Sequence, residues 1–139
     1  MMEIKQVDRE CVDVFWDKVK NWIYSAAKQS KGRHTLKTTY NLLKDGQMTM
    51  FLITHNKAIS AVYVVQKVFY PAKQVLCILF CGGSRVIKNI KKIESFFSSY
   101  AKKNQCDGLE IIGRKGWGKA IKNNNLKFEQ TGYFYEMAT

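Results

Sequence analysis

The chain has 139 residues, of which 46% are hydrophobic, and this predicts one domain over residues 1–139 with one core. Its formal net charge is +12, and no apolar run approaches the roughly 20 residues of a membrane-spanning helix. Met1 to Cys11 is too charged for a signal peptide. We therefore expect a cytoplasmic protein without a membrane partner.

The positive charge lies almost entirely after the first 17 residues. Residues 18–139 carry 21 bases against six acids. Such a surface favours polyanions: nucleic acid, an acidic protein or a phosphorylated cofactor. Lysine supplies 19 of the 23 bases, and with the many asparagines this is also what an AT-rich genome produces. Charge alone therefore allows weak nucleic-acid binding through lysines but does not identify it.

Four cysteines are scattered along the chain without a Cys-x-x-Cys pair: Cys11, Cys77, Cys81 and Cys106. Only His34 and His55 could add ligands, and neither stands at metal-ligand spacing to a cysteine. We predict no metal site, and buried free thiols.

The first third of the chain predicts one strand and two helices. Glu3 to Val7 is a short strand. From Asp8 or Arg9 to about Lys28, apolar residues recur on one helical side, which predicts a helix. Gln29 to His34 is a polar, basic break; we interpret it as a loop, with contact to a substrate or polyanion as the alternative. Thr35 opens a second helix that ends at Asp45-Gly46.

A β-rich region follows. Met48 to Thr54 and Ile59 to Tyr70, separated by His55-Asn56-Lys57, predict an antiparallel hairpin. Pro71-Ala72-Lys73 then turns the chain into Val75 to Cys81, which is apolar on both alternating faces, as expected of a central strand. His55 at the turn is more typical of a solvated loop residue than of a catalytic one.

Lys73 to Gly113 predicts a βαβ unit. Gly82-Gly83 follows the central strand, Ser84 is the candidate N-cap, and apolar residues three or four apart then predict a helix. They are Val86, Ile87, Ile90, Ile93, Phe96, Phe97, Tyr100 and Ala101. Gly108 to Gly113 returns to strand, and a helix between adjacent strands requires a parallel, right-handed crossover. The glycines would then precede a helix N-terminus, where backbone N–H groups can bind an anion.

The remaining residues predict a short helix and a last strand. The helix passes through Ala120 and Ile121 and ends in Asn123-Asn124-Asn125. Trp117 would anchor it to the core or, alternatively, stack on a substrate. Leu126 to Met137 is aromatic and β-rich and is expected to close the sheet. The element order is therefore β-α-α-β-β-β-α-β-α-β, an α/β (α+β) fold with a mixed central sheet.

This order resembles the GNAT superfamily of acetyl-coenzyme-A-dependent N-acetyltransferases. More narrowly, the chain is similar to the small GNAT-like proteins of tailed bacteriophages and prophages, in Cys81-Gly82-Gly83 and in Gly113-Arg114-Lys115-Gly116-Trp117. That narrower resemblance implies phage virion proteins as partners and a location in the host cytoplasm or the virion.

The resemblance implies a cofactor site. In GNAT proteins the fourth and fifth strands splay apart, the pantetheine arm of acetyl-CoA enters the gap, and the pyrophosphate sits at the start of the next helix. By position, pantetheine would face Leu79, Phe80 and Cys81, and the pyrophosphate would face Gly82, Gly83, Ser84 and Arg85. The segment CGGSRV departs from the usual loop in its glycine spacing. Ile121 also stands where many members have the tyrosine that reprotonates the thiolate.

Three further residues are candidates for catalysis. Glu110 is the candidate general base, because its side chain alternates away from its apolar neighbours on the fifth strand. The alternative is a carboxylate paired with Arg114 or a lysine; Arg114 could equally hold phosphate. Tyr133 and Tyr135 could reach the site from the last strand, or pack there as aromatic strand residues usually do.

Two functions remain open at this point. The first is transfer of acetyl from acetyl-CoA to a primary amine. The alternative is a catalytically inactive GNAT-fold protein that serves in a phage virion, or binds a host or viral protein or nucleic acid through its basic surface.

Overall fold

The computed structural model describes residues 1–84, 88–113, 116–132 and 134–139. Five strands form one sheet in the order β1-β2-β3-β4-β5. Their bounds are β1 (Met2–Val7), β2 (Thr49–His55), β3 (Ala58–Phe69), β4 (Gln74–Gly83) and β5 (Gly108–Ile111). Neighbours from β1 to β4 are antiparallel, and β5 joins β4 in parallel, as the βαβ prediction requires.

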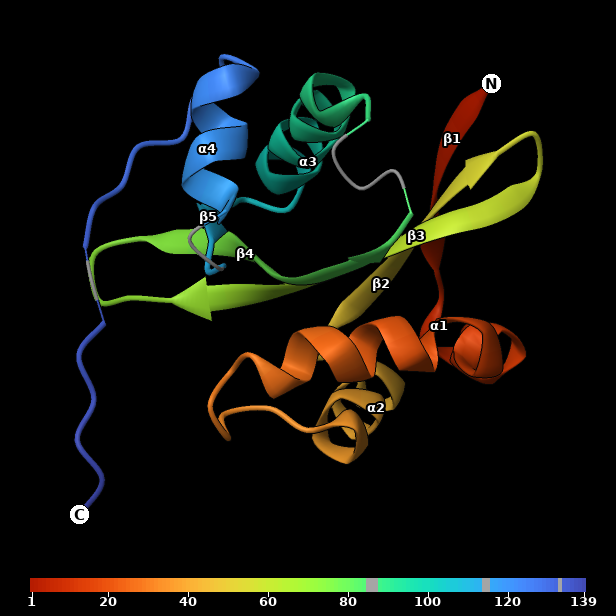
Figure 1. The fold of residues 1–139 in the computed structure, drawn as a ribbon, viewed down its shortest axis with the longest axis horizontal. Coiled ribbons are helices and arrows are strands. Elements are labelled where there is room, and N and C mark those ends of the chain that lie inside the picture. The colour runs from red at the N-terminus through yellow and green to blue at the C-terminus, as the bar shows by residue number, and fades with distance from the viewer. Residues whose placement is uncertain (85–87, 114–115, 133) are drawn as a thin grey trace.

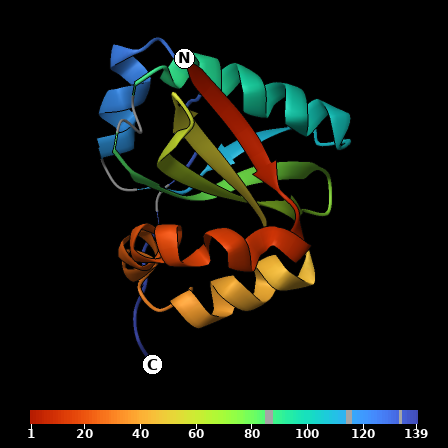
Figure 2. The same ribbon diagram turned by 90° about the vertical axis from the view of Figure 1, so that its right-hand side faces the viewer.

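Helices cover both faces of this sheet. Figures 1 and 2 show α1 (Val12–Lys28) and α2 (Leu36–Asp45) on one face, and α3 (Ile90–Lys103) and α4 (Gly116–Asn123) on the other. A short 3₁₀ turn, η1 (Arg9–Cys11), leads from β1 into α1. No helix among the described residues is long and apolar enough to cross a membrane.

The predicted start and end of α2 are confirmed. Thr35 is the N-cap: its hydroxyl oxygen accepts a hydrogen bond from the Thr38 amide, and the Thr38 hydroxyl oxygen accepts one from the Thr35 amide. This reciprocal capping satisfies backbone donors that the first helical turn leaves open. Gly46 closes the helix at φ 82°, a left-handed conformation that glycine adopts without strain.

Each face of the sheet has its own core. On the α3 side, Phe51 of β2 and Tyr63 of β3 pack against Phe97, whose side chain is fully buried. On the α1–α2 side, Val64 and Phe80 pack with Val19 and other apolar residues. Strands β2, β3 and β4 are therefore apolar on both faces, which explains why their sequences alternate so little.

The junction of β4 and α3 differs from the expectation. Gly82 and Gly83 continue β4 and pair with Val62 and Ala61 of β3, so they are not a turn between strand and helix. Ser84 does not cap the helix either: its amide and hydroxyl both donate to the carbonyl oxygen of Ser60. The helix begins at Ile90 with Asn89 as N-cap. The strand runs on because β3 offers it a partner, a tertiary effect that local composition does not reveal. Of the predicted helical stripe, Val86 and Ile87 lie outside the described residues.

The predicted last strand is wrong over the described part of Leu126 to Met137, which has no strand. Figures 1 and 2 show this segment descending from the α3–α4 layer to the α1–α2 layer. There Glu136 forms an ion pair with Arg33, whose guanidinium lies over the ring of Phe134. Phe134 and Tyr135 stay outside the core, at 78% and 91% exposed. Their β propensity is therefore not supported by burial, on which strand stability largely depends.

The conformation of Gly83 generates a stability prediction. Its φ is +117°, and a Cβ added there would lie 2.7 Å from the Ala61 Cα and closer still to the Ser60 carbonyl oxygen. We expect Gly83→Ala to lower the free energy of unfolding by about 2 kcal/mol or more. Urea unfolding followed by circular dichroism measures it. Gly108→Ala in β5 is the matched control, because an added Cβ meets nothing within 4 Å there. Equal midpoints for the two variants would contradict the assigned backbone.

Candidate functional site

The two parallel strands pair over only part of their length. The ladder joins Val75 with Gly108 and continues to Ile78 with Ile111, where it stops. Strand β4 runs on to Gly83, still paired with β3. Over residues 79–83, β4 thus has one bonded edge and, in the described part of the chain, an opposite edge that β5 does not reach.

A β-bulge lies at the point of parting. Val64 pairs with Phe80 and Val65 pairs with Ile78, so Leu79 is the extra residue of β4. A bulge bends its strand and increases the local twist. Strand β4 can therefore follow β3 while it turns away from β5. Beyond Ile78 the two strands are no longer paired, and we call the place where β4 and β5 part the opening.

The residues predicted to face pantetheine do lie along this opening. Phe80 is buried on the α1–α2 side of the sheet, with Leu79 packed at the margin of the same cluster. Cys81 is half-buried and packs on the α3 side. The side chains flank the opening on both faces, so its edge is formed by the backbone of β4.

Close packing accounts for glycine at positions 82 and 83 without a ligand. A Cβ on Gly82 would lie 2.9 Å from the Cβ of Trp22 and 3.1 Å from its carbonyl oxygen, so α1 touches the backbone of β4 there. At Gly83, the positive φ and the close approach of the Ser60 carbonyl group both disfavour any residue with a side chain. A phosphate-binding role for Gly82, Gly83 and Ser84 stays a prediction. Arg85 lies outside the described residues.

Glu110 is next to the opening and has a specific partner. It lies opposite Cys77, one pair before the ladder ends. Its carboxylate oxygens accept the hydroxyl of Tyr70 at 3.1 and 2.9 Å. The observed partner is thus a tyrosine from the end of β3, which sequence spacing had not indicated; Arg114 lies outside the described residues.

The environment of Glu110 shifts the pKa of two neighbours. The hydrogen bond to Glu110 raises the pKa of Tyr70, which keeps the phenol protonated as the donor. Burial raises the pKa of the Cys77 thiol to about 12, and the Glu110 charge adds to the shift. Cys77 is therefore a neutral thiol and not a nucleophile.

The other predicted residues have no described contact with this site. Tyr135 is 91% exposed, and Tyr133 is not among the described residues. Trp117 is half-buried with its ring over Gly113, where an added Cβ would lie 2.9 Å from the indole Nε1. This contact agrees with a structural anchor for α4.

Sequence reasoning missed the position of His34. This residue lies at the end of the loop between α1 and α2, and its ring meets Phe80 edge-on with centroids 5.2 Å apart. Because Phe80 directly follows the bulge, the imidazole lies on the α1–α2 face of the opening. In the sequence, His34 stands in a polar loop directly before the N-cap of α2, a pattern that does not indicate such a contact. The two residues are 46 positions apart and meet only in the folded chain.

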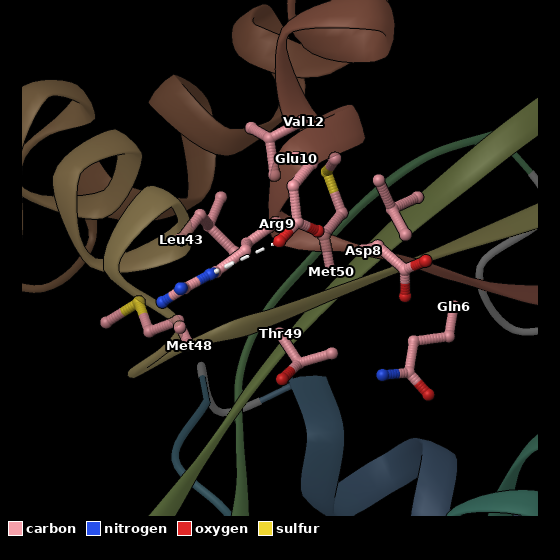
Figure 3. A pocket seen from close by; sticks show the side chains of 11 residues that line it. Gln6, Asp8, Arg9, Glu10, Val12, Leu43, Met48, Thr49 and Met50 are labelled. Carbon is pink, nitrogen blue, oxygen red and sulfur yellow. Dashed lines mark ion pairs between the residues drawn. The ribbon is translucent and has the colours of Figure 1, made fainter.

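Two hollows lie elsewhere on the surface. One, of about 570 Å³, runs along α3 and the segment after α4. It is lined by Lys91, Glu94, Ser95, Ser98, Ser99, Leu109, Asn125, Lys127 and Phe128. The other, of about 240 Å³, is lined by residues of β1, η1, α2 and the start of β2, and β3 separates it from β4 in the sheet order. Figure 3 shows Arg9 extending across this second hollow with its ion pair to Glu10. The Arg9 guanidinium also donates to the Asp45 carbonyl oxygen, so its charge serves the local structure.

The cysteines remain apart in the folded chain. Among the residues that the structure describes, no three His, Cys, Asp or Glu side chains gather in one place. Cys77 and Cys106 are buried as predicted, but Cys11 is exposed, because it lies in η1 and not in the core stripe of α1.

Comparison with solved structures shows the fold. A possible acetyltransferase from Clostridium difficile 630 superposes with a TM-score of 0.67 at 14% identity, covering 100% of this chain and 98% of its own. A predicted acetyltransferase from Clostridium acetobutylicum, crystallised with acetyl-CoA, gives 0.68 at 14% identity, with 99% and 96% covered. The ribosomal-protein-alanine N-acetyltransferase of Brucella melitensis biovar Abortus 2308 gives 0.68 at 12% identity, with 100% and 99% covered.

The chain therefore has the GNAT acetyltransferase fold, in the α+β form with parallel β4 and β5. No family model matches the sequence. No curated protein matches it either.

The exposed thiol of Cys11 and the buried thiol of Cys77 should react at different rates. At about pH 8 a thiol with a pKa near 12 is ionised in roughly one molecule in ten thousand, and Cys77 is also buried, whereas Cys11 is exposed. We expect iodoacetamide to modify Cys11 rapidly and Cys77 only after unfolding in urea. Peptide mass mapping over a time course measures both rates, and equal rates in the folded protein would contradict the burial of β4.

Proposed function

We propose that this chain binds acetyl-CoA in the opening between β4 and β5 and transfers the acetyl group to a primary amine. The observation that carries the proposal is the outer edge of β4 beyond Ile78, which the Leu79 bulge separates from β5. A strand edge at the centre of a fold needs hydrogen-bond partners. Pantetheine is a narrow chain with two amide groups, so it can pair with that edge as an added strand would.

Positive charge on the α3 face of the sheet suits a phosphorylated cofactor. Lys91 lies in the first turn of α3, and Lys127 and Glu94 line the same hollow. Both lysines are exposed, as are Lys88 and Lys92 at the same helix end. These cations provide a landing site for the phosphates of a cofactor whose thioester end reaches into the opening. The acetyl-CoA found with the Clostridium acetobutylicum protein of the same fold supports this choice of ligand.

The opposite face of the opening suits the acceptor. There the loop between α1 and α2 brings His34 onto Phe80, and the carboxylate of Glu110 lies one strand pair back from the opening. An amine that enters from this side meets the thioester from the face that the cofactor does not occupy. Direct transfer in a ternary complex follows from that arrangement, without a covalent intermediate on the protein.

A second candidate is a GNAT-fold protein that does not catalyse transfer. It is favoured by the packing of Gly82 against Trp22, which explains that glycine without any ligand, and by Ile121 at the expected tyrosine position. In this case the basic surface would bind a protein or nucleic acid. The link to tailed bacteriophages, and a place in a virion, remain predictions under either candidate.

Isothermal titration calorimetry with acetyl-CoA and CoA tests the proposal. We expect wild-type protein to bind both with a Kd in the micromolar range, about −8 kcal/mol. Lys91→Glu should weaken binding about tenfold at low salt, because it replaces an attraction to phosphate with a repulsion. Lys67→Glu is the control: Lys67 is also exposed but lies in β3, outside the residues that line the hollow.

Mass spectrometry then measures acetylation of three probe amines: a peptide with a free N-terminus, an N-blocked peptide with one lysine, and spermidine. Transfer of acetyl to any of these three amines supports the proposed acetyltransferase activity. No heat of binding at about 1 mM acetyl-CoA would overturn the proposal. Binding without transfer would leave the second candidate in its place.

A further inference from the structure

The loop between α1 and α2 holds His34 in a defined position. The hydroxyl of Ser30 accepts the His34 amide at 2.9 Å and donates to the His34 carbonyl oxygen at 3.2 Å. The next residue, Thr35, is fixed by the capping box of α2. The backbone on both sides of His34 is therefore restrained, as is expected of a group that must meet a reactant in one orientation.

The imidazole is directed to the sheet opening by its contact with β4. Its ring stands at 89° to the ring of Phe80, with 5.2 Å between centroids. Phe80 is 4% exposed and belongs to the part of β4 that has left β5. His34 as a whole is half-buried, so it contacts the Phe80 ring while part of the residue remains exposed to solvent.

The protonation state of His34 agrees with this placement. Burial lowers the pKa of His34 below its ordinary value of about 6.5, and the charge of Arg33 lowers it further. The apolar Phe80 faces the ring from β4, and Glu136 of the C-terminal segment pairs with Arg33. A lowered pKa means that the neutral, proton-accepting form predominates at pH 7 and is lost only as the pH falls through that lowered value.

Glu110 is less suited to take a proton. Both of its carboxylate oxygens already accept the Tyr70 hydroxyl. It also pairs with Cys77, two residues before the bulge, whereas Phe80 follows the bulge directly. Glu110 thus already has a hydrogen-bond donor and lies within the ladder, whereas His34 lies against the part of β4 beyond it.

Resting on the proposed function, we infer that His34 is the general base of the acetyl transfer. The imidazole takes one proton from the ammonium group of the acceptor, and the resulting amine attacks the thioester carbonyl. A C–N bond forms and the C–S bond breaks. The second amine proton passes to the leaving thiolate, directly or through water, to give the amide and CoA. The imidazolium then returns its proton to solvent.

The test compares histidine variants in the same assay, which follows the acetylated probe amines by mass spectrometry because the exposed Cys11 would react with a thiol reagent. His34→Gln should lower kcat by about 100-fold or more while the Kd for CoA stays within about twofold. His34→Ala should behave alike and recover in part with added imidazole. His55→Gln is the matched control, because the chain has only these two histidines and His55 lies at the end of β2.

The pH profile adds a readout that a purely structural role would not change. In the wild-type protein kcat/KM should fall as the pH drops below about 6.5, and this limb should disappear in His34→Gln. An NMR titration of the two imidazole signals, assigned with the two variants, should place the pKa of His34 below about 6.5 without any turnover.

The outcomes separate the two proposals. If His34→Gln keeps full activity and the same fall of kcat/KM at low pH, the role of His34 is overturned, but the proposed acetyltransferase activity is not. A loss confined to Glu110→Gln has the same consequence and would make that carboxylate the base. An inactive wild-type protein overturns both proposals.

Discussion

The hydrogen-bonded ladder between β4 and β5 ends at the pair Ile78–Ile111, and the candidate site depends on this limit. Its cause is local: Leu79 is an extra residue against β3, and the bulge turns the rest of β4 away from β5. If β5 followed β4 to Gly83, backbone groups of the two strands would satisfy one another and the sheet would have no opening. The bulge therefore converts an ordinary parallel pair into a binding edge.

The far half of β4 must be held in place by something other than β5. It is held on one side by β3, through pairs that reach Gly83 and then Ser84. On one face it is also held by α1, because Gly82 allows Trp22 to pack directly on the strand backbone. The glycine pair thus has a structural task that is independent of any phosphate, and this task explains why the glycine spacing differs from that of a usual cofactor loop. The packing of this part of β4 also positions Phe80, whose ring meets the His34 ring edge-on.

Periodicity and capping residues predicted the elements well because they report local preferences. The helices α1 and α2, the hairpin of β2 and β3, the central β4 and the parallel β5 all appear near their expected positions. The errors arise where tertiary contacts decide the structure. Pairing with β3 extends β4 through Gly83, and Phe134 and Tyr135 lack the burial that a closing strand would need. The positions of Leu79 to Cys81 on β4 and of Glu110 on β5 were predictable from the strand patterns, and their roles remain predictions. The Tyr70–Glu110 and His34–Phe80 contacts were not, because each joins segments that meet only in the folded chain.

Amide hydrogen exchange by NMR, with and without CoA, tests the central claim most directly. With the ladder to β5 ending at Ile78, amides of Leu79 and Phe80 that face β5 should exchange far faster than those from Val75 to Ile78, and CoA should slow them. Slow exchange along the whole of β4 in the free protein would contradict the account, because it would mean that the strand edge is already paired.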